Sequence, residues 1–200
     1  NKSIAVILNN DNYLDFTTQG RLLSGIADGL IILFVYKILL LFEKKYNFDK
    51  AIKYWGSFFY SIMVLPIQLS HFFAVDTFMN LFIFVSFYFA LKYSLFINNK
   101  NIYLSALFLG LGIASKVSAF LISPLIVYLI WYKNKNLRQF LNINFIYFII
   151  LYLTLRIFNP YLFNSPNLIN PSINKLFIDN IFTLKSYEGL NTWYPPAIQW

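Results

Sequence analysis

Apolar runs of membrane length are the feature that most restricts how this chain can fold. The run from residue 77 to residue 97 contains a single charged side chain, Lys92. About 20 apolar residues suffice for a helix that crosses the roughly 30 Å hydrocarbon core of a bilayer. Similar runs recur along the chain up to residue 157, so we predict that the chain is embedded in a membrane.

The composition supports this prediction. Of the 200 residues, 58% are hydrophobic and only 12% are charged, whereas a soluble domain carries about 25% charged residues. So little polar surface cannot cover a water-soluble globule, which indicates an integral membrane protein. The net charge of +8 does not indicate nucleic-acid binding, because the lysines lie in short clusters between apolar runs. Cysteine is absent, which excludes a disulfide framework and a thiolate metal site.

We predict an all-α, polytopic transmembrane helix bundle of about six spans. A single helix over residues 102–132 would reach about 46 Å, well beyond the hydrocarbon core, and Ser115 and Lys116 interrupt it near the middle. We therefore predict two short spans that turn at Lys116. The six predicted spans cover residues 22–42, 51–69, 77–97, 102–115, 118–132 and 140–157.

The positions of lysine and arginine predict the orientation of these spans. With both ends of the chain outside, the two short outer loops carry only Lys116, and the basic residues concentrate in the inner loops, as the positive-inside rule requires. Lys37 would extend its side chain to the inner face. The inner basic residues are Lys44, Lys45, Lys50, Lys53, Lys92, Lys100, Lys133, Lys135 and Arg138.

The composition changes after Phe158, where five of the seven prolines lie. We therefore predict a transmembrane core over residues 1–158 and the start of a large outer loop over residues 159–200. Within that loop, the apolar residues from Ile173 to Leu184 recur at helical spacing. They predict a short amphipathic helix, either on the outer membrane surface or packed on the bundle. The chain starts at Asn1 and stops at Trp200 within a loop, so we expect it to be a fragment.

Polar residues gather at the outer face in this topology. Arg21, Ser24 and Asp28 share one face of the first span. The other members of the group are His71 and Asp76 in the second outer loop, Lys116 at the third outer turn and Arg156 near the outer end of the sixth span. Several cations beside the carboxylate of Asp76 suit a phosphate-bearing lipid headgroup, since cations hold phosphate by charge-assisted pairs and a carboxylate handles a proton or a metal.

Each of these residues also has a plainer interpretation. Asp76 precedes a helix and can serve only as its N-cap. His71 can be an amphipathic residue at the membrane interface, and Lys116 an ordinary turn residue in water. Asp28 can pair with Arg21 or hydrogen-bond a neighbouring helix. Arg156 near a span end costs free energy unless it extends to water or finds a partner.

Several segments taken together resemble a known family, by their order and spacing more than by any single motif. They are Gly20-Arg21-Leu22-Leu23-Ser24, His71-Phe72-Phe73-Ala74-Val75-Asp76-Thr77, Ala114-Ser115-Lys116, Arg156-Ile157-Phe158-Asn159-Pro160-Tyr161 and Tyr194-Pro195-Pro196-Ala197-Ile198-Gln199-Trp200. This series resembles the phospholipid-carrier-dependent glycosyltransferases of the GT-C superfamily, whose relatives include protein O-mannosyltransferases and the aminoarabinose transferase of lipid A.

The resemblance implies an enzyme that moves a sugar from a polyprenyl-phosphate carrier to a protein or lipid acceptor outside the membrane, in a prokaryotic plasma membrane with its active face outward. It implies that Asp76 is a functional, catalytic carboxylate. It also implies that Lys116, Arg156 and Tyr161 bind the carrier phosphate or headgroup, and the position of Arg21 adds it to this group. Asp76 can instead hold a divalent metal together with His71; no cofactor is otherwise expected.

One departure from the family pattern concerns its first acidic motif, which should precede Arg21. Asp11 and Asp15 lie close to Arg21, but neither sits beside a glutamate. We expect that this motif and the first span lie upstream of the fragment, that the C-terminal half is also missing, and that the piece alone is inactive. The alternative from another class is a non-catalytic polytopic protein, such as a lipid or glycan flippase or transporter, or a scaffold subunit without a site.

Overall fold

The computed structural model describes residues 13–96, 98–165, 167 and 170–188. The chain divides into two compact units, Asn1–Thr154 and Leu155–Trp200, and each is described by itself. The described residues form helices and connectors, apart from one isolated antiparallel bridge between Phe163 and Ile173. The predicted all-α fold class is confirmed.

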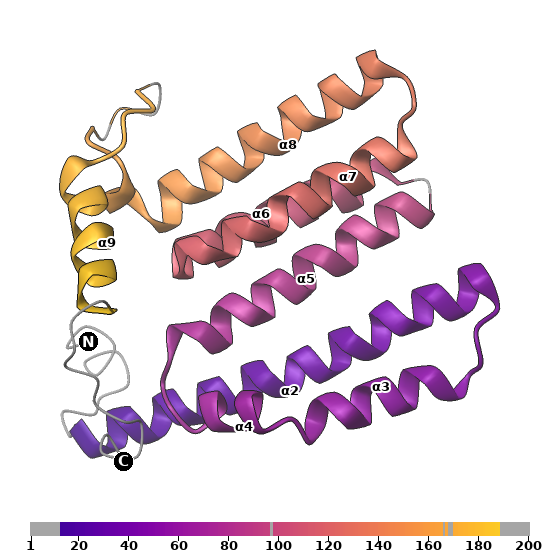
Figure 1. Ribbon diagram of the computed structural model, residues 1–200, viewed down its shortest axis with the longest axis horizontal. Helices are drawn as coiled ribbons and strands as arrows, with labels where there is room; N and C mark the ends of the chain where they lie inside the picture. The colour runs from indigo at the N-terminus through magenta and orange to yellow at the C-terminus, as the bar shows by residue number, and fades with distance from the viewer. Residues whose placement is uncertain (1–12, 97, 166, 168–169, 189–200) are drawn as a thin grey trace. The chain divides into compact units, whose positions relative to one another are not determined.

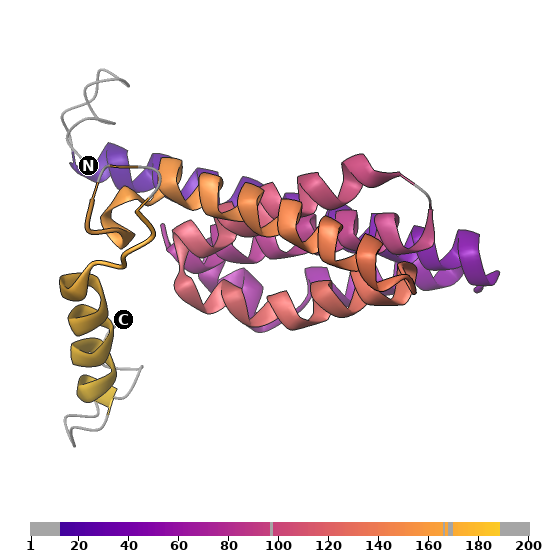
Figure 2. The same cartoon turned by 90° about the horizontal axis from the view of Figure 1, so that it is seen from above.

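The first unit is an array of helices that lie side by side (Figures 1 and 2). Chain direction alternates between neighbouring segments such as α5 and α6, so the array has two ends. One end holds the start of α5 and the end of α6, and the other holds the end of α5 and the start of α6. The elements are α2 (Tyr13–Tyr46), α3 (Ala51–Ser61), α4 (Val64–Ser70), α5 (Val75–Leu95), α6 (Asn99–Ser115), the 3-10 helix η1 (Val117–Ile122), α7 (Ser123–Lys133) and α8 (Leu137–Phe158), whose last residues belong to the second unit.

Among the described residues, three helices are long and apolar enough to cross a membrane. They are Thr17–Tyr46 within α2, Val75–Leu95 and Leu137–Phe158, and a shorter apolar segment covers Val117–Lys133. These helices support the integral membrane protein that the composition predicts.

Local sequence explains where several helices begin and end. The predicted span over residues 51–69 is divided into α3 and α4, with Met63 in an extended conformation between them. Pro66 accounts for the division, because proline has no N–H to donate to the carbonyl four residues earlier and its ring clashes with that carbonyl. At the start of α6 the Asn98 side chain accepts a hydrogen bond from the Lys100 backbone N–H at 3.0 Å, a typical N-cap.

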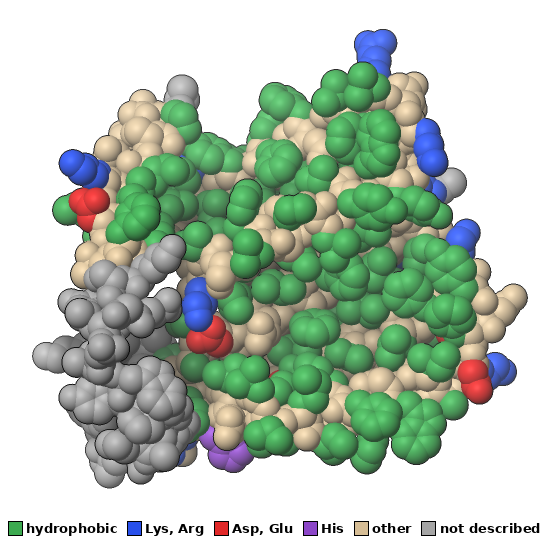
Figure 3. Space-filling view, in the orientation of Figure 1, with side chains coloured by type: hydrophobic (Ala, Val, Ile, Leu, Met, Phe, Trp, Pro, Cys, Tyr) green, Lys and Arg blue, Asp and Glu red, His purple; other side chains and the backbone are tan. Residues whose placement is uncertain are grey.

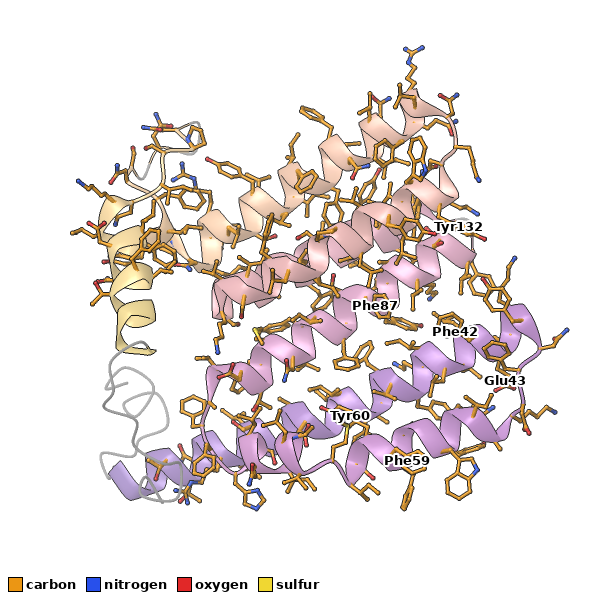
Figure 4. The ribbon with its side chains drawn as sticks, in the orientation of Figure 1. Phe42, Glu43, Phe59, Tyr60, Phe87 and Tyr132 are labelled. Atoms are coloured by element: carbon orange, nitrogen blue, oxygen red, sulfur yellow. The ribbon has the colours of Figure 1, made fainter. Side chains whose placement is uncertain are left out.

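Apolar packing joins α2 to α5. Ile38, Leu41 and Leu91 are buried, and large aromatic side chains from both helices pack against them. Figure 4 shows two of these aromatics, Phe42 and Phe87, between the two helices. On the outside of the array, Phe59 points away from α3 with 58% of its surface exposed, which suits a side chain that faces lipid. Figure 3 shows hydrophobic side chains spread widely over the visible face of the first unit, with charged side chains near its two ends.

Small and polar residues join the more buried helices. The Ser86 hydroxyl on α5 donates to the Ser105 backbone carbonyl on α6 at 2.9 Å, and both serines are fully buried. Gly110 on α6 lies directly against Thr154 on α8, where an added Cβ would come within 2.7 Å of the threonine Cβ. Close approach at small residues and hydrogen bonds between helices are the usual means of helix association in a bilayer.

The second unit continues from the last turn of α8. A short 3-10 helix, η2 (Pro160–Leu162), is followed by a loop that folds back at the Phe163–Ile173 bridge, and α9 (Lys175–Glu188) completes the described part. A helix was predicted in this segment from Ile173, and it begins two residues later. Whether it lies on the membrane surface stays a prediction.

Candidate functional site

The candidate site lies at the end of the first unit where α2 and α5 begin and α6 ends. The turn between α4 and α5 carries Phe73, which packs on Gly20 of α2 so closely that an added Cβ would come within 2.5 Å of the phenylalanine ring. This contact holds the turn against the beginning of α2. Arg21 and His71 are therefore brought to the same end of the array as Asp76.

Asp76 is the second residue of α5, and its carboxylate accepts a hydrogen bond from the Lys116 ammonium at 2.5 Å. The N-cap of α5 is Ala74, in an extended conformation, and no side chain caps the helix. The alternative that Asp76 serves as the N-cap is therefore wrong. A carboxylate in the first turn is still favoured by the partial positive charge of the helix N-terminus.

Lys116 lies at the break between α6 and η1. Its backbone is extended, with φ −153° and ψ 127°, and its N–H donates to the Gly112 carbonyl at 2.9 Å. This conformation ends α6 and projects the side chain towards α5. The Lys116 side chain is 48% exposed and the Asp76 side chain 31%, so a ligand can reach the ion pair from outside the protein. An exposed pair of this kind contributes only about 0–1 kcal/mol to stability, which leaves its charges available for another role.

Arg21 and His71 line a groove of about 680 Å³ between the beginning of α2 and the end of α4. Both side chains are exposed. His71 Nδ1 lies 2.7 Å from the Ile67 backbone oxygen. Because a carbonyl can only accept, Nδ1 must carry the proton, and Nε2 is the ring nitrogen left to act as an acceptor or ligand. The groove thus offers the Arg21 guanidinium to an anionic ligand and the His71 Nε2 to a hydrogen-bond donor.

Asp28, deeper in α2, is bound by a neighbouring helix. Its carboxylate accepts a hydrogen bond from the Tyr60 hydroxyl of α3 at 3.0 Å, and it forms no ion pair with Arg21 among the described residues. Of the two interpretations that the sequence left open for Asp28, the interhelical hydrogen bond is the one that the structure supports.

Arg156 belongs to the second unit, where backbone carbonyls surround it. The side chain is buried, one guanidinium nitrogen donates to the Ser165 carbonyl at 2.7 Å, and another donates to the Asn170 carbonyl. The guanidinium carbon lies 4.0 Å from the centre of the Phe163 ring, a cation–π distance. Arg156 therefore fastens the loop after α8 to the end of that helix.

Tyr161 also belongs to the second unit. Its exposed ring meets Phe177 of α9 edge to face, with 6.2 Å between ring centres. The approach of Arg156 and Tyr161 to Asp76 and Lys116 stays a prediction. The Tyr194–Trp200 segment and Asp11 lie outside the described residues, as does the side chain of Asp15.

The described residues do not fit a divalent metal. They contain no group of three or more histidine, cysteine, aspartate or glutamate side chains that could hold one. A hard divalent cation prefers several oxygen ligands, so no step is assigned to a metal.

The family of the chain follows from comparison with known proteins. The family model described as dolichyl-phosphate-mannose-protein mannosyltransferase matches residues 15–163. The chain belongs to this family. No curated protein matches the chain, and no solved structure does. Membership supports a membrane glycosyltransferase of the mannosyltransferase type. It also confirms the resemblance to the GT-C superfamily.

The match to the mannosyltransferase family contains every candidate site residue. Arg21, His71, Asp76, Lys116 and the Arg156–Tyr161 segment all lie between residues 15 and 163. The part of the chain that carries the predicted site is therefore the part that the family shares, although the match assigns no role to any residue.

Direct contact between Asp76 and Lys116 was not predicted, although both were placed at the same membrane face. The two residues are 40 positions apart. The interruption of the apolar run at Ser115 and Lys116 could have predicted the contact. A residue with an extended backbone after a helix can direct its side chain sideways, onto the neighbouring helix. The ion pair between Glu43 and Lys53, at 2.6 Å, was also missed.

Proposed function

We propose that the chain transfers a sugar from a polyprenyl-phosphate carrier to a protein or lipid acceptor at the outer face of the membrane. The observation that carries the proposal is the accessible Asp76–Lys116 pair, at 2.5 Å, at the same end of the array as the groove of Arg21 and His71. A carboxylate beside exposed cations at a membrane edge matches what a phosphate leaving group and a protonated nucleophile require.

Lys116 and Arg21 are the groups that bind the carrier phosphate. Lysine offers a compact charge with rotatable donors, and arginine offers a planar fork that matches phosphate oxygens. The apolar wall of the groove, which includes Leu22 and Ile26, suits the isoprenoid chain next to the headgroup. The family resemblance expects Arg156 and Tyr161 to bind the same headgroup, although Arg156 is buried and engaged by backbone carbonyls of its own unit.

The chemical step is a substitution at the anomeric carbon of the sugar. The acceptor hydroxyl or amine attacks this carbon and forms the new glycosidic bond, while the bond from the carbon to the phosphate oxygen breaks. The electron pair of the broken bond leaves with the carrier phosphate, where Lys116 stabilises the developing charge. The acceptor proton passes to a carboxylate.

Asp76 would accept this proton itself, or it would orient the group that accepts it. The family resemblance expects a further acidic motif before Arg21, which would share the work. In either role, Asp76 needs its negative charge. Replacing it with asparagine keeps the shape of the side chain and removes that charge.

The test is transfer from a labelled polyprenyl-phosphate sugar by the whole protein in liposomes. Asp76→Asn should lower the transfer rate about 100-fold or more, the usual contribution of a positioned acid or base. Asp49→Asn is the matched control, because Asp49 is exposed near the start of α3 and makes only a local hydrogen bond to the Ala51 N–H. Full activity of the Asp76 variant would remove Asp76 from the mechanism.

The same liposome assay distinguishes a transferase from a transporter. A flippase would move labelled carrier lipid between leaflets without forming a glycosylated product. Movement of the lipid without product in the presence of acceptor would contradict the transferase proposal.

A further inference from the structure

A small pocket at the other end of the first unit is lined by three lysines. It has a volume of about 270 Å³ and lies between α2 and α5. Lys37 and Lys44 reach it from α2 and Lys92 from α5. Asp76 and Lys92 are 16 residues apart on α5, or about 24 Å at 1.5 Å per residue, so the pocket is separate from the candidate site.

Helical spacing brings these lysines together with apolar residues. Lys37 and Lys44 are seven residues apart, which puts them two turns apart on one face of α2. Leu40 and Leu41 lie between them in the sequence and also line the pocket, as does Phe96, the residue that follows α5. The pocket therefore combines an apolar wall with a cationic rim.

The charges of this pocket are not compensated by acidic groups in the described part of the chain. The two ion pairs found there are Lys53–Glu43 and Lys116–Asp76, and neither includes a pocket lysine. The Lys37 ammonium lies 5.0 Å from the centre of the Phe34 ring, and the Lys92 ammonium 5.7 Å from that of Tyr88. Three lysines thus line one small pocket, and among the described residues none of them forms an ion pair with a carboxylate.

Of the three lysines, Lys37 gives the strongest reason to expect an anion in the pocket. It lies nine residues before the end of α2, about 13 Å along the helix axis, within an apolar stretch long enough to cross a membrane. An ionisable residue at such a position is costly and needs a partner of opposite charge or access to the interface. An anion bound in the pocket would supply that partner.

We propose that this pocket binds the phosphate headgroup of an anionic phospholipid, in the leaflet opposite the Asp76–Lys116 pair. The ammonium groups of Lys37, Lys44 and Lys92 hold the phosphate by charge-assisted hydrogen bonds. The lipid's acyl chains lie against Leu40 and Phe96, which are not buried. Basic pockets between transmembrane helices are established sites for anionic headgroups, and this proposal does not depend on the transferase activity.

The test uses the whole protein, delipidated in a neutral detergent. Its thermal unfolding and native mass spectra are recorded with added dioleoylphosphatidylglycerol, dioleoylphosphatidylcholine or inorganic phosphate. We expect phosphatidylglycerol to bind and raise the unfolding temperature, and the other two probes to do neither. Equal binding of the two lipids by the unaltered protein would overturn the proposal, as would inorganic phosphate that stabilises the protein as well as the anionic lipid does.

Variants then assign the binding to the pocket. The double variant Lys37→Gln/Lys92→Gln should bind phosphatidylglycerol about 25-fold more weakly, about fivefold for each lysine removed. Lys100→Gln/Lys135→Gln is the matched control, since it removes the same charge at the same end of the array from residues that do not line the pocket.

The control should bind as the unaltered protein does, and Lys37→Arg/Lys92→Arg should keep most of the affinity. An equal loss in the pocket and control variants would show a general surface-charge effect and would overturn the assigned site.

Discussion

At each end of the first unit, the described residues form a lysine–carboxylate ion pair, and the two pairs differ in exposure rather than in length. Lys116–Asp76 measures 2.5 Å, with side chains 48% and 31% exposed. Lys53–Glu43 measures 2.6 Å, with side chains 10% and 18% exposed. The Lys53 ammonium also lies over the rings of Tyr36 and Tyr54, at 5.9 and 5.3 Å from their centres.

This difference separates a structural pair from one that can exchange partners. Glu43 lies near the end of α2, and Lys53 lies in the first turn of α3 (Figure 4 labels Glu43), so their pair fastens the two helices across a short connector. Tyrosine rings enclose it and leave little room for another ligand. The Asp76–Lys116 pair has open surroundings, so a phosphate can compete with the carboxylate for the ammonium.

Among the tests of this difference between the two ion pairs, we expect Lys116→Gln to have the largest effect, and to have it on the transfer rate. Removing the ammonium should lower sugar transfer about 100-fold or more, since one lost electrostatic contact to a developing charge costs that much. The free energy of unfolding should change by no more than about 1 kcal/mol, because the pair is exposed. The measurements are the liposome transfer assay and thermal unfolding of the same preparation. A stability loss that matches the activity loss would contradict the open-pair interpretation.

We expect Glu43→Gln to lower stability and leave the transfer rate unchanged, the opposite of Lys116→Gln. This change leaves the Lys53 ammonium shielded and without its carboxylate, and breaking one side of a shielded pair is strongly destabilising. The unfolding temperature should fall further than in Asp76→Asn, while the transfer rate per folded molecule stays the same. Thermal unfolding of both variants in one detergent makes the comparison. A smaller fall for Glu43→Gln than for Asp76→Asn would remove the distinction between the two pairs.

A smaller effect is expected from two glycines of α6, the helix that ends at Lys116. Gly110→Ala should destabilise the protein by about 1–3 kcal/mol, the usual cost of overpacking, because its Cβ would clash with Thr154 on α8. Gly112→Ala is the matched control, since its Cβ would meet neighbours at an ordinary 3.5 Å; it should change stability by no more than about 1 kcal/mol. Thermal unfolding of both variants measures the difference, and equal losses would show that α6 is not seated on α8 as described.

Much of the fold followed from the sequence because hydrocarbon demands long apolar helices. The all-α class, the membrane setting and the family were correct. The division of residues 51–69 into α3 and α4 was not foreseen, because a continuous apolar composition conceals the effect of one proline, Pro66, on the backbone. Composition reports whether a segment prefers lipid, and it is less informative about where the helix breaks.

The site was harder to predict than the fold. Topology placed Asp76 and Lys116 at one face, but a contact across 40 residues depends on the packing of α5 on α6. For Arg156, the need for a partner followed from the cost of a buried charge. Its acceptors are backbone carbonyls of a later loop, and carbonyls are present at every residue, so no sequence pattern marks them.

The Asp76–Lys116 contact has a consequence for kinetics if the proposed transfer takes place there. While the carrier is absent, the lysine ammonium donates a hydrogen bond to the carboxylate and occupies one of its oxygens. Arrival of the phosphate draws the lysine away and frees the carboxylate for the nucleophile. Such an arrangement favours an obligatory order, with the donor bound before the acceptor.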